Sequence, residues 1–144
     1  MIIVSACLVG LKSRYDGSSK PKEELIKLLT KGKVIPLCPE QLGGLPTPRL
    51  PAEILFGDGT DVVNGKSKVI RKDGIDITEQ FIKGAKQVLQ IALLIGAKKA
   101  ILKDGSPSCG VNFINRKGVI VKGMGVTTTL LKNNGIKVIS SDSF

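Results

Sequence analysis

The 144-residue sequence contains no histidine and no tryptophan, and only one tyrosine and four phenylalanines. Without histidine, the chain can form no Ser-His-Asp triad, no Cys-His dyad and no His-ligated zinc site. Any acid–base chemistry must therefore come from Glu, Asp, Lys, Tyr, Cys or water. The scarcity of aromatic rings also argues against the usual base-stacking surface for nucleic acids.

Long apolar runs are missing as well. No stretch approaches the roughly 18 to 20 apolar residues that cross a bilayer. The opening segment 1–7 is apolar, but it lacks the charged flank of a signal peptide and is soon followed by Lys12 and Arg14. The three cysteines, an odd number, come without secretory features. We therefore expect no membrane association and a reducing, cytoplasmic location.

Acidic residues are few, since 12 Asp and Glu oppose 22 Lys and Arg and leave a formal charge of +10. Such an excess fits a solvated lysine-rich surface, and it equally fits an anionic partner. Because aromatic side chains are scarce, a nucleotide-sized anion is easier to accommodate here than a long nucleic acid.

Short apolar runs alternate with amphipathic segments along the chain. We expect strands at 1–6, 33–37, 100–103 and 136–139, helices at 21–32, 76–96 and 127–133, a small hairpin at 111–121, and weaker strands at 61–63 and 67–70. Four helix breakers favour an irregular loop at 41–49. The alternation predicts an α/β fold for residues 1–144: a single-domain, Rossmann-like, mostly parallel sheet with flanking helices.

Cys7, Cys38 and Cys109 each close or just follow one of these strands. If the strands are parallel, all three thiols reach the carboxyl edge, where open α/β sheets bind ligands. Three thiolates there could hold an iron–sulfur cluster and leave one iron free, although the cysteine spacing of ferredoxins is missing. The residues alone also fit a zinc site completed by a carboxylate or water, thiol catalysis, or buried thiols without chemistry.

Two further candidates share loops with these cysteines. Glu40 lies two residues after Cys38, and a carboxylate beside an apolar site can act as an acid or a base. Ser106 lies three residues before Cys109, from where its hydroxyl could reach the same cavity. A solvated or loop-capping Glu and a turn-forming Ser are equally consistent with these positions.

Two stretches rich in glycine and hydroxyl groups are candidates for binding phosphate. Gly125 and Thr127 stand at the start of a helix, whose backbone N–H groups favour an anion. Ser18, Ser19 and Lys20 follow a glycine in a loop that combines hydroxyls with a cation. Arg49 is a further candidate for binding substrate. Turn formation alone would also explain both stretches.

Several motifs follow one another in the order that is typical of the thiouracil desulfidase family, long catalogued only as a domain of unknown function. They are Ser5-Ala6-Cys7-Leu8-Val9-Gly10, Arg14-Tyr15-Asp16-Gly17, Cys38-Pro39-Glu40, Gly43-Gly44-Leu45-Pro46-Thr47-Pro48-Arg49, Pro51-Ala52-Glu53-Ile54, Lys103, Ser106-Pro107-Ser108-Cys109-Gly110 and Gly123-Met124-Gly125-Val126-Thr127. The chain resembles this family over nearly its whole length.

The resemblance implies a 4Fe-4S cluster on Cys7, Cys38 and Cys109 with its fourth iron open, and catalytic roles for Glu40 and Ser106. It also implies removal of sulfur from thiolated uracil, from its nucleotides, or in related enzymes from thiolated tRNA. In the mechanism that we expect, such a cluster would supply a Lewis-acidic iron with an affinity for the exocyclic sulfur. Glu40 activates or positions water, Ser106 orients the base or relays a proton, and no net redox change occurs.

The chain departs from the family pattern at two places. Many members carry a cysteine before the Arg-Tyr-Asp-Gly motif, where this chain has Ser13, and many carry Tyr-Asp-Gly where it has residues 114–118. The second departure bears on the choice of substrate. We favour thiouracil or thio-UMP, because 144 residues leave no room for a separate RNA-binding domain. The alternatives are a tRNA thiouridine desulfidase and a non-catalytic, metal-stabilised RNA-binding domain.

Overall fold

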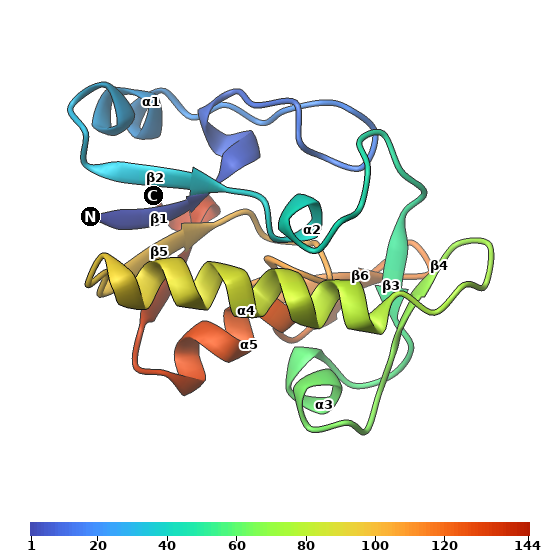
Figure 1. Ribbon diagram of the computed structural model, residues 1–144. Helices are drawn as coiled ribbons and strands as arrows, with labels where there is room; N and C mark the ends of the chain where they lie inside the picture. Colours follow the sequence, from blue (N-terminus) through green and yellow to red (C-terminus); the bar gives the residue numbers. More distant parts are fainter.

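A parallel four-stranded sheet forms the centre of the molecule (Figure 1). The computed structural model describes residues 1–144. The strands lie in the order β2-β1-β5-β8 and span Val34–Leu37 (β2), Ile2–Ser5 (β1), Lys99–Leu102 (β5) and Lys137–Ser140 (β8). In the centre, Ile2 of β1 pairs with Val34 on one side and Lys99 on the other. The predicted α/β class and the four principal strands are confirmed.

Helices cover both faces of this sheet (Figure 1). On one face lie α1 (Glu23–Thr30) and the short 3-10 helix η1 (Ala6–Val9), and on the other lie α4 (Thr78–Leu94) and α5 (Val126–Asn133). Successive side chains of β1 point to opposite faces, as the pleat of a strand requires. Ile3 is buried in the core with α4 and α5, whereas Val4 is buried in the core with α1.

The long helix α4 lies within the range 76–96 that the sequence predicts, although it starts two residues later than expected, at Thr78. Asp76 accepts hydrogen bonds from the backbone N–H of Thr78 at 2.9 Å and from its hydroxyl at 2.6 Å, just where the helix starts. Phe81, Ala85 and Val88 recur at helical spacing, and each is at most 2% exposed. Neither α4 nor any other helix combines the length and apolar character that crossing a membrane would need.

Two antiparallel strand pairs stand beside the main sheet. They are β3 (Ala52–Ile54) with β4 (Val69–Arg71), and β6 (Phe113–Arg116) with β7 (Val119–Lys122). The second pair is the hairpin that the sequence predicts, and β4 agrees with the weak strand expected at 67–70. Both pairs pack with α3 (Gly59–Val63) and the first half of α4 around a second core.

The strand expected at 61–63 is wrong, because these residues belong to α3. The carboxylate of Asp58 accepts the N–H of Thr60 at 2.9 Å, and the Asp61 carboxylate accepts the N–H of Asp58 at 2.9 Å. This reciprocal capping fixes the first turn of a helix despite the β-branched valines that follow.

The expected loop after Cys38 begins instead with one helical turn, α2 (Pro39–Leu42). Proline is favoured at the first position of a helix because its ring already has the helical φ angle. The turn ends at Gly43, where a side chain would collide with the backbone carbonyl of Gln80 in α4. The close approach of α2 to α4 therefore fixes where the chain continues past Cys38. A last 3-10 turn, η2 (Ser141–Ser143), follows β8.

Candidate active site

Three strands of the sheet end at one edge, and the segment after each of them carries a cysteine. Cys7 lies in η1 directly after β1, Cys38 directly follows β2, and Cys109 lies in the loop after β5. The strand order reverses at β1, which has β2 on one side and β5 on the other. Open α/β sheets bind their ligands outside such a reversal point.

All three cysteines line one cavity of about 760 Å³. A cavity of this size suits a small ligand. The loops at the carboxyl edge of the sheet form one wall of the cavity. The segments of β3, β4 and β6 form the other wall, so both antiparallel pairs help to close it. Glu40, Arg49 and Ser106 line the same space.

Burial shapes the chemistry of these thiols. Cys7 and Cys109 are each 7% exposed, and Cys38 is half-buried. Burial raises the pKa of all three thiols above its ordinary value, most strongly for Cys109. A negative charge on Cys38 further raises the pKa of both other thiols, which means that the three groups are close enough to interact.

Groups that stabilise a thiolate accompany the cysteines. The charges of Arg14 and Lys103 lower the pKa of Cys7, opposing the effect of its burial. Backbone N–H groups at Glu40 and Gln41 act in the same way on Cys38. These donors and cations suit thiolates bound to a metal centre, where part of their negative charge remains.

The donor set fits an iron–sulfur cluster better than a single ion. No group of three His, Cys, Asp or Glu side chains is arranged to hold one metal ion, which disagrees with a zinc site. The cysteines of a cubane cluster bind different irons, so three thiols spaced around one cavity suit it. The three thiols, the adjacent cations and the volume of the cavity are all consistent with this group.

Glu40 and Arg49 form a largely buried ion pair at the cavity. The Nε atom of Arg49 donates to Oε1 of Glu40 at 3.0 Å. The side chain of Arg49 is 6% exposed and that of Glu40 is 16% exposed. Glu40 lies in the first turn of α2, two residues after Cys38, so the turn brings a carboxylate beside a thiol.

Ser106 and Asp104 hold the loop that carries Cys109. The hydroxyl oxygen of Ser106 accepts the N–H of Cys109 at 2.7 Å. The carboxylate of Asp104, 4% exposed, accepts the N–H groups of Val111 at 2.7 Å and Asn112 at 2.9 Å. Burial would raise the pKa of Asp104, but these bonds and one from the Ser140 hydroxyl outweigh it and lower that pKa.

Only one of the six residues predicted to bind substrate or phosphate lines the cavity. Arg49 lines the cavity, whereas Ser18, Ser19, Lys20, Gly125 and Thr127 do not. The role of these five residues stays a prediction.

Gly125 and Thr127 instead support the loop of Cys109. The Thr127 hydroxyl lies 3.0 Å from that of Ser108, and Thr127 is fully buried. A side chain on Gly125 would collide with the backbone of Ser108.

Sequence reasoning missed part of the cationic lining. Arg14, Lys72, Lys103 and Lys117 all line the cavity. Arg14 and Lys103 belong to the motifs shared with the desulfidase family, so their membership in these motifs could have identified them as site residues. Lys72 and Lys117 carry no such signal, because the two short antiparallel pairs bring them to the cavity.

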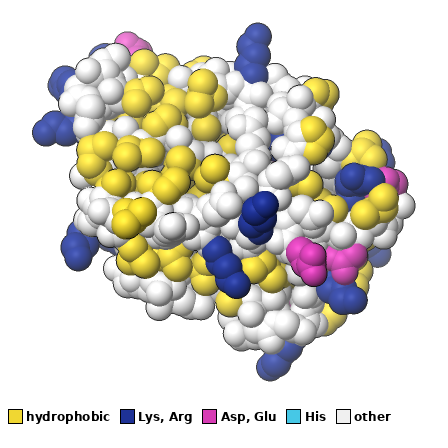
Figure 2. All heavy atoms as spheres, viewed as in Figure 1, with side chains coloured by type: hydrophobic (Ala, Val, Ile, Leu, Met, Phe, Trp, Pro, Cys, Tyr) yellow, Lys and Arg dark blue, Asp and Glu magenta, His cyan; other side chains and the backbone are white.

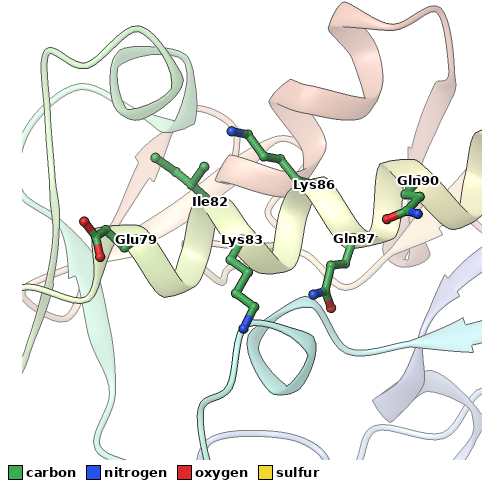
Figure 3. Close-up of a pocket in the computed structure, with 6 residues that line it drawn as sticks. All are labelled: Glu79, Ile82, Lys83, Lys86, Gln87 and Gln90. Atoms are coloured by element: carbon green, nitrogen blue, oxygen red, sulfur yellow. The ribbon is translucent and has the colours of Figure 1, made fainter.

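A second, smaller depression of about 340 Å³ lies on the outer side of α4. Figure 3 shows its lining projecting from that helix alone: Glu79, Ile82, Lys83, Lys86, Gln87 and Gln90. It holds no thiol and receives no group from a second element. The larger cavity with the three cysteines is therefore the better candidate for the functional site.

Comparison with known proteins agrees with this geometry. A family model described as 2-thiouracil desulfurase matches residues 2–143. The uncharacterized protein YbbK of Bacillus subtilis (strain 168) is 46% identical over 145 residues, covering 99% of this chain and 96% of YbbK. The solved structure of TudS, a 4Fe-4S-dependent thiouracil desulfidase, matches with a TM-score of 0.88 and 43% identity over 99% of this chain and 91% of TudS. The chain therefore belongs to the 2-thiouracil desulfurase family.

Proposed function

We propose that this protein is a 4Fe-4S-dependent desulfidase that converts the C=S group of thiouracil or thio-UMP to C=O and releases hydrosulfide. The observation that carries the proposal is the gathering of Cys7, Cys38, Cys109 and the Glu40–Arg49 pair around one cavity. The likeness to TudS supports both the cluster and the reaction class.

The three cysteines would hold the cluster through their thiolates. When bound, the cluster supplies a Lewis-acidic iron without a protein ligand, which has an affinity for sulfur. Arg14 and Lys103 would offset the negative charge that the thiolates bring into the cavity. The chain contains no fourth cysteine and no histidine that could occupy the remaining position.

Glu40 would act on the attacking water. Its Oε1 atom is held by Arg49, and its Oε2 atom has no hydrogen-bond partner within the chain. Water adds through its oxygen to the C=S carbon, and Oε2 accepts one of its protons. As water adds, the π electron pair of C=S moves onto sulfur, and the carbon then carries both a hydroxyl and the sulfur. The C–S bond then breaks, the hydroxyl becomes the new C=O group, and its proton passes to the sulfur, which leaves as hydrosulfide. The proton held by Oε2 is released to solvent. No electron is transferred to or from the substrate.

Ser106 would orient the substrate. Its oxygen accepts the N–H of Cys109, so the hydroxyl proton remains available to a group in the cavity. A hydroxyl proton can bond to a carbonyl oxygen or a ring nitrogen of the pyrimidine. Ser106 therefore links the position of the substrate to the loop that carries one of the cluster ligands.

The charge of the cavity favours the nucleotide. Arg14, Lys72, Lys103 and Lys117 line it and would attract a phosphate group. On the face shown in Figure 2, Lys and Arg side chains are scattered, some of them beside acidic ones, and form no continuous basic field. The alternative substrate, thiolated tRNA, is favoured by the formal charge of +10.

The test is sulfide release by the anaerobically reconstituted protein from thiouracil, thio-UMP and thiolated tRNA. We expect release from the small substrates, with weak dependence on salt. A steep loss of rate with salt and activity on tRNA alone would favour the polymer, since many counterions are then released on binding. Full cluster occupancy without sulfide release from any substrate would favour the non-catalytic domain.

A further inference from the structure

Four of the five N–H groups of the Arg49 guanidinium donate to acceptors within the protein. Its Nε atom donates to Glu40 Oε1 at 3.0 Å, and its Nη2 atom donates to the carbonyl of Ser13 at 2.9 Å. Its Nη1 atom donates to the Thr47 hydroxyl at 2.9 Å and to the carbonyl of Pro46 at 3.2 Å. All three nitrogens thus have acceptors within the chain, and the side chain is 6% exposed.

This arrangement is unlike that of an arginine that binds phosphate. Recognition of a phosphate uses two parallel N–H groups of the guanidinium, which must face the ligand together. In Arg49, the Nε edge faces Glu40 and both Nη atoms face backbone or hydroxyl oxygens. Binding a phosphate would require breaking several of these bonds in a largely dry environment, which is costly.

The Arg49 guanidinium connects the loop at Ser13 with the helix α2, and both of these segments lie next to Cys38. The backbone N–H of Arg49 donates to the carbonyl of Tyr15 at 2.7 Å, so the residue is held by its main chain as well. The Ser13 carbonyl that accepts Nη2 also lies 3.7 Å from the thiol sulfur of Cys38. Arg49 therefore fixes the carboxylate of Glu40 relative to the loop that borders the Cys38 thiol.

We propose that Arg49 is a positioning residue that holds Glu40 by one oxygen and leaves Oε2 directed to the reacting water, and that it does not bind the substrate phosphate. The inference rests on the proposed function. It replaces the substrate-binding role expected for Arg49 from the sequence with one that acts through Glu40.

Kinetics of Arg49→Gln distinguish the two roles. A misplaced Glu40 lowers kcat by about 10²-fold, by the same factor for thiouracil and thio-UMP, with little change in KM. In a Glu40→Gln background the same substitution lowers kcat by less than about 3-fold, because the group through which it acts is already lost. A loss confined to thio-UMP, or a full additional loss in the Glu40→Gln background, overturns the inference.

Two further variants complete the kinetic test, one conservative substitution at Arg49 and one control elsewhere in the protein. Arg49→Lys keeps the charge but cannot reach all the acceptors at once, and we expect an equal loss for both substrates, about 10-fold. Lys27→Gln is the control, because Lys27 forms an exposed ion pair with Glu23 on α1, at 3.6 Å, and lines no part of the cavity. Its kcat stays at the wild-type value. An equal fall of kcat in Lys27→Gln contradicts a specific role for Arg49.

A measurement on the cluster-free protein separates this inference from the proposed function. Arg49→Gln leaves a buried carboxylate without its partner and lowers Tm by roughly 10 °C. Combined with Glu40→Gln, the loss of Tm is smaller than the sum of the two single losses. Additive losses overturn the pairing. If the wild-type protein releases no sulfide, the proposed function fails, whereas this coupling still tests the Arg49–Glu40 contact.

Discussion

Gly84 of α4 lies against the backbone carbonyl of Pro39 in α2, so closely that a side chain at Gly84 would overlap the oxygen. The helix α2 follows Cys38 and carries Glu40 in its first turn. A backbone contact between two helices therefore sets the position of one proposed cluster ligand and of the proposed base. The site depends on packing outside the cavity.

Gly84→Ala tests this dependence. Alanine raises the helix propensity of α4 by about 1 kcal/mol, yet its methyl group must push α2 away. We expect sulfide release to fall by at least about 10-fold and the cluster to be lost faster in air. Lys86→Ala, on the exposed side of the same helix, serves as the control and keeps wild-type values. Wild-type activity in Gly84→Ala would contradict the role assigned to this contact.

Substitution of each cysteine tests the ligand set. Cys7→Ala, Cys38→Ala and Cys109→Ala should each lose the brown absorbance and the sulfide release together, because two thiolates hold a cubane cluster poorly. Visible absorbance and iron content of anaerobic preparations measure this. Ser13→Ala is the comparison, since the Ser13 hydroxyl donates only to the Leu11 carbonyl, at 3.4 Å. A cysteine variant that keeps both colour and activity removes that residue from the site.

Much of this geometry could be predicted from the sequence. Strands such as 1–6 and 100–103 read as buried apolar runs, and parallel strands bring the residues that follow them to one edge. The convergence of Cys7, Cys38 and Cys109 on one cavity therefore followed from where those strands end. The motifs then identified the family, because many short patterns occurred in one order.

Three features of the structure could not be predicted from the sequence, and each has a physical reason. α2 is a single turn beside glycines and prolines, and its stability comes from contact with α4, which local sequence does not reveal. Glu40 and Arg49 stand nine positions apart in the sequence, and most of the chain between them is irregular, so no periodic pattern predicts their pairing. The helix at 59–63 depends on caps from Asp58 and Asp61, which outweigh the β-branched residues that suggested a strand.

Glu40→Gln tests the proposed base. The amide cannot accept a proton from water, so we expect sulfide release to fall by about 10²-fold or more. The cluster content should stay at the wild-type level, because Glu40 is not among the thiol ligands. Parallel measurement of iron content and rate separates chemistry from assembly. A fully active Glu40→Gln protein would exclude Glu40 from the reaction.

Asp104→Asn tests how the Cys109 loop is held. The pKa of Asp104 is lowered in the folded protein, so its stabilising effect is present above the pKa of the unfolded chain, about 3.9, and is lost as pH falls through the lower folded value. The asparagine variant should be less stable at neutral pH by on the order of 2 kcal/mol, since an amide cannot accept all the bonds that the carboxylate accepts.

The measurement is Tm of the cluster-free protein between about pH 3 and pH 7. The difference between the wild-type protein and Asp104→Asn should be constant near neutrality and shrink toward the acid end. A difference that stays constant over the whole range would mean that the charge of Asp104 does not stabilise the loop.

The central claim is that thiols from the ends of three parallel strands hold one cluster with an open iron. Iron and acid-labile sulfide, determined per chain after anaerobic reconstitution, test it most directly. We predict about four of each per wild-type chain, and almost none in the variant that lacks Cys7, Cys38 and Cys109. A folded wild-type protein that binds a single zinc ion, or that stays colourless and free of iron, would contradict the account.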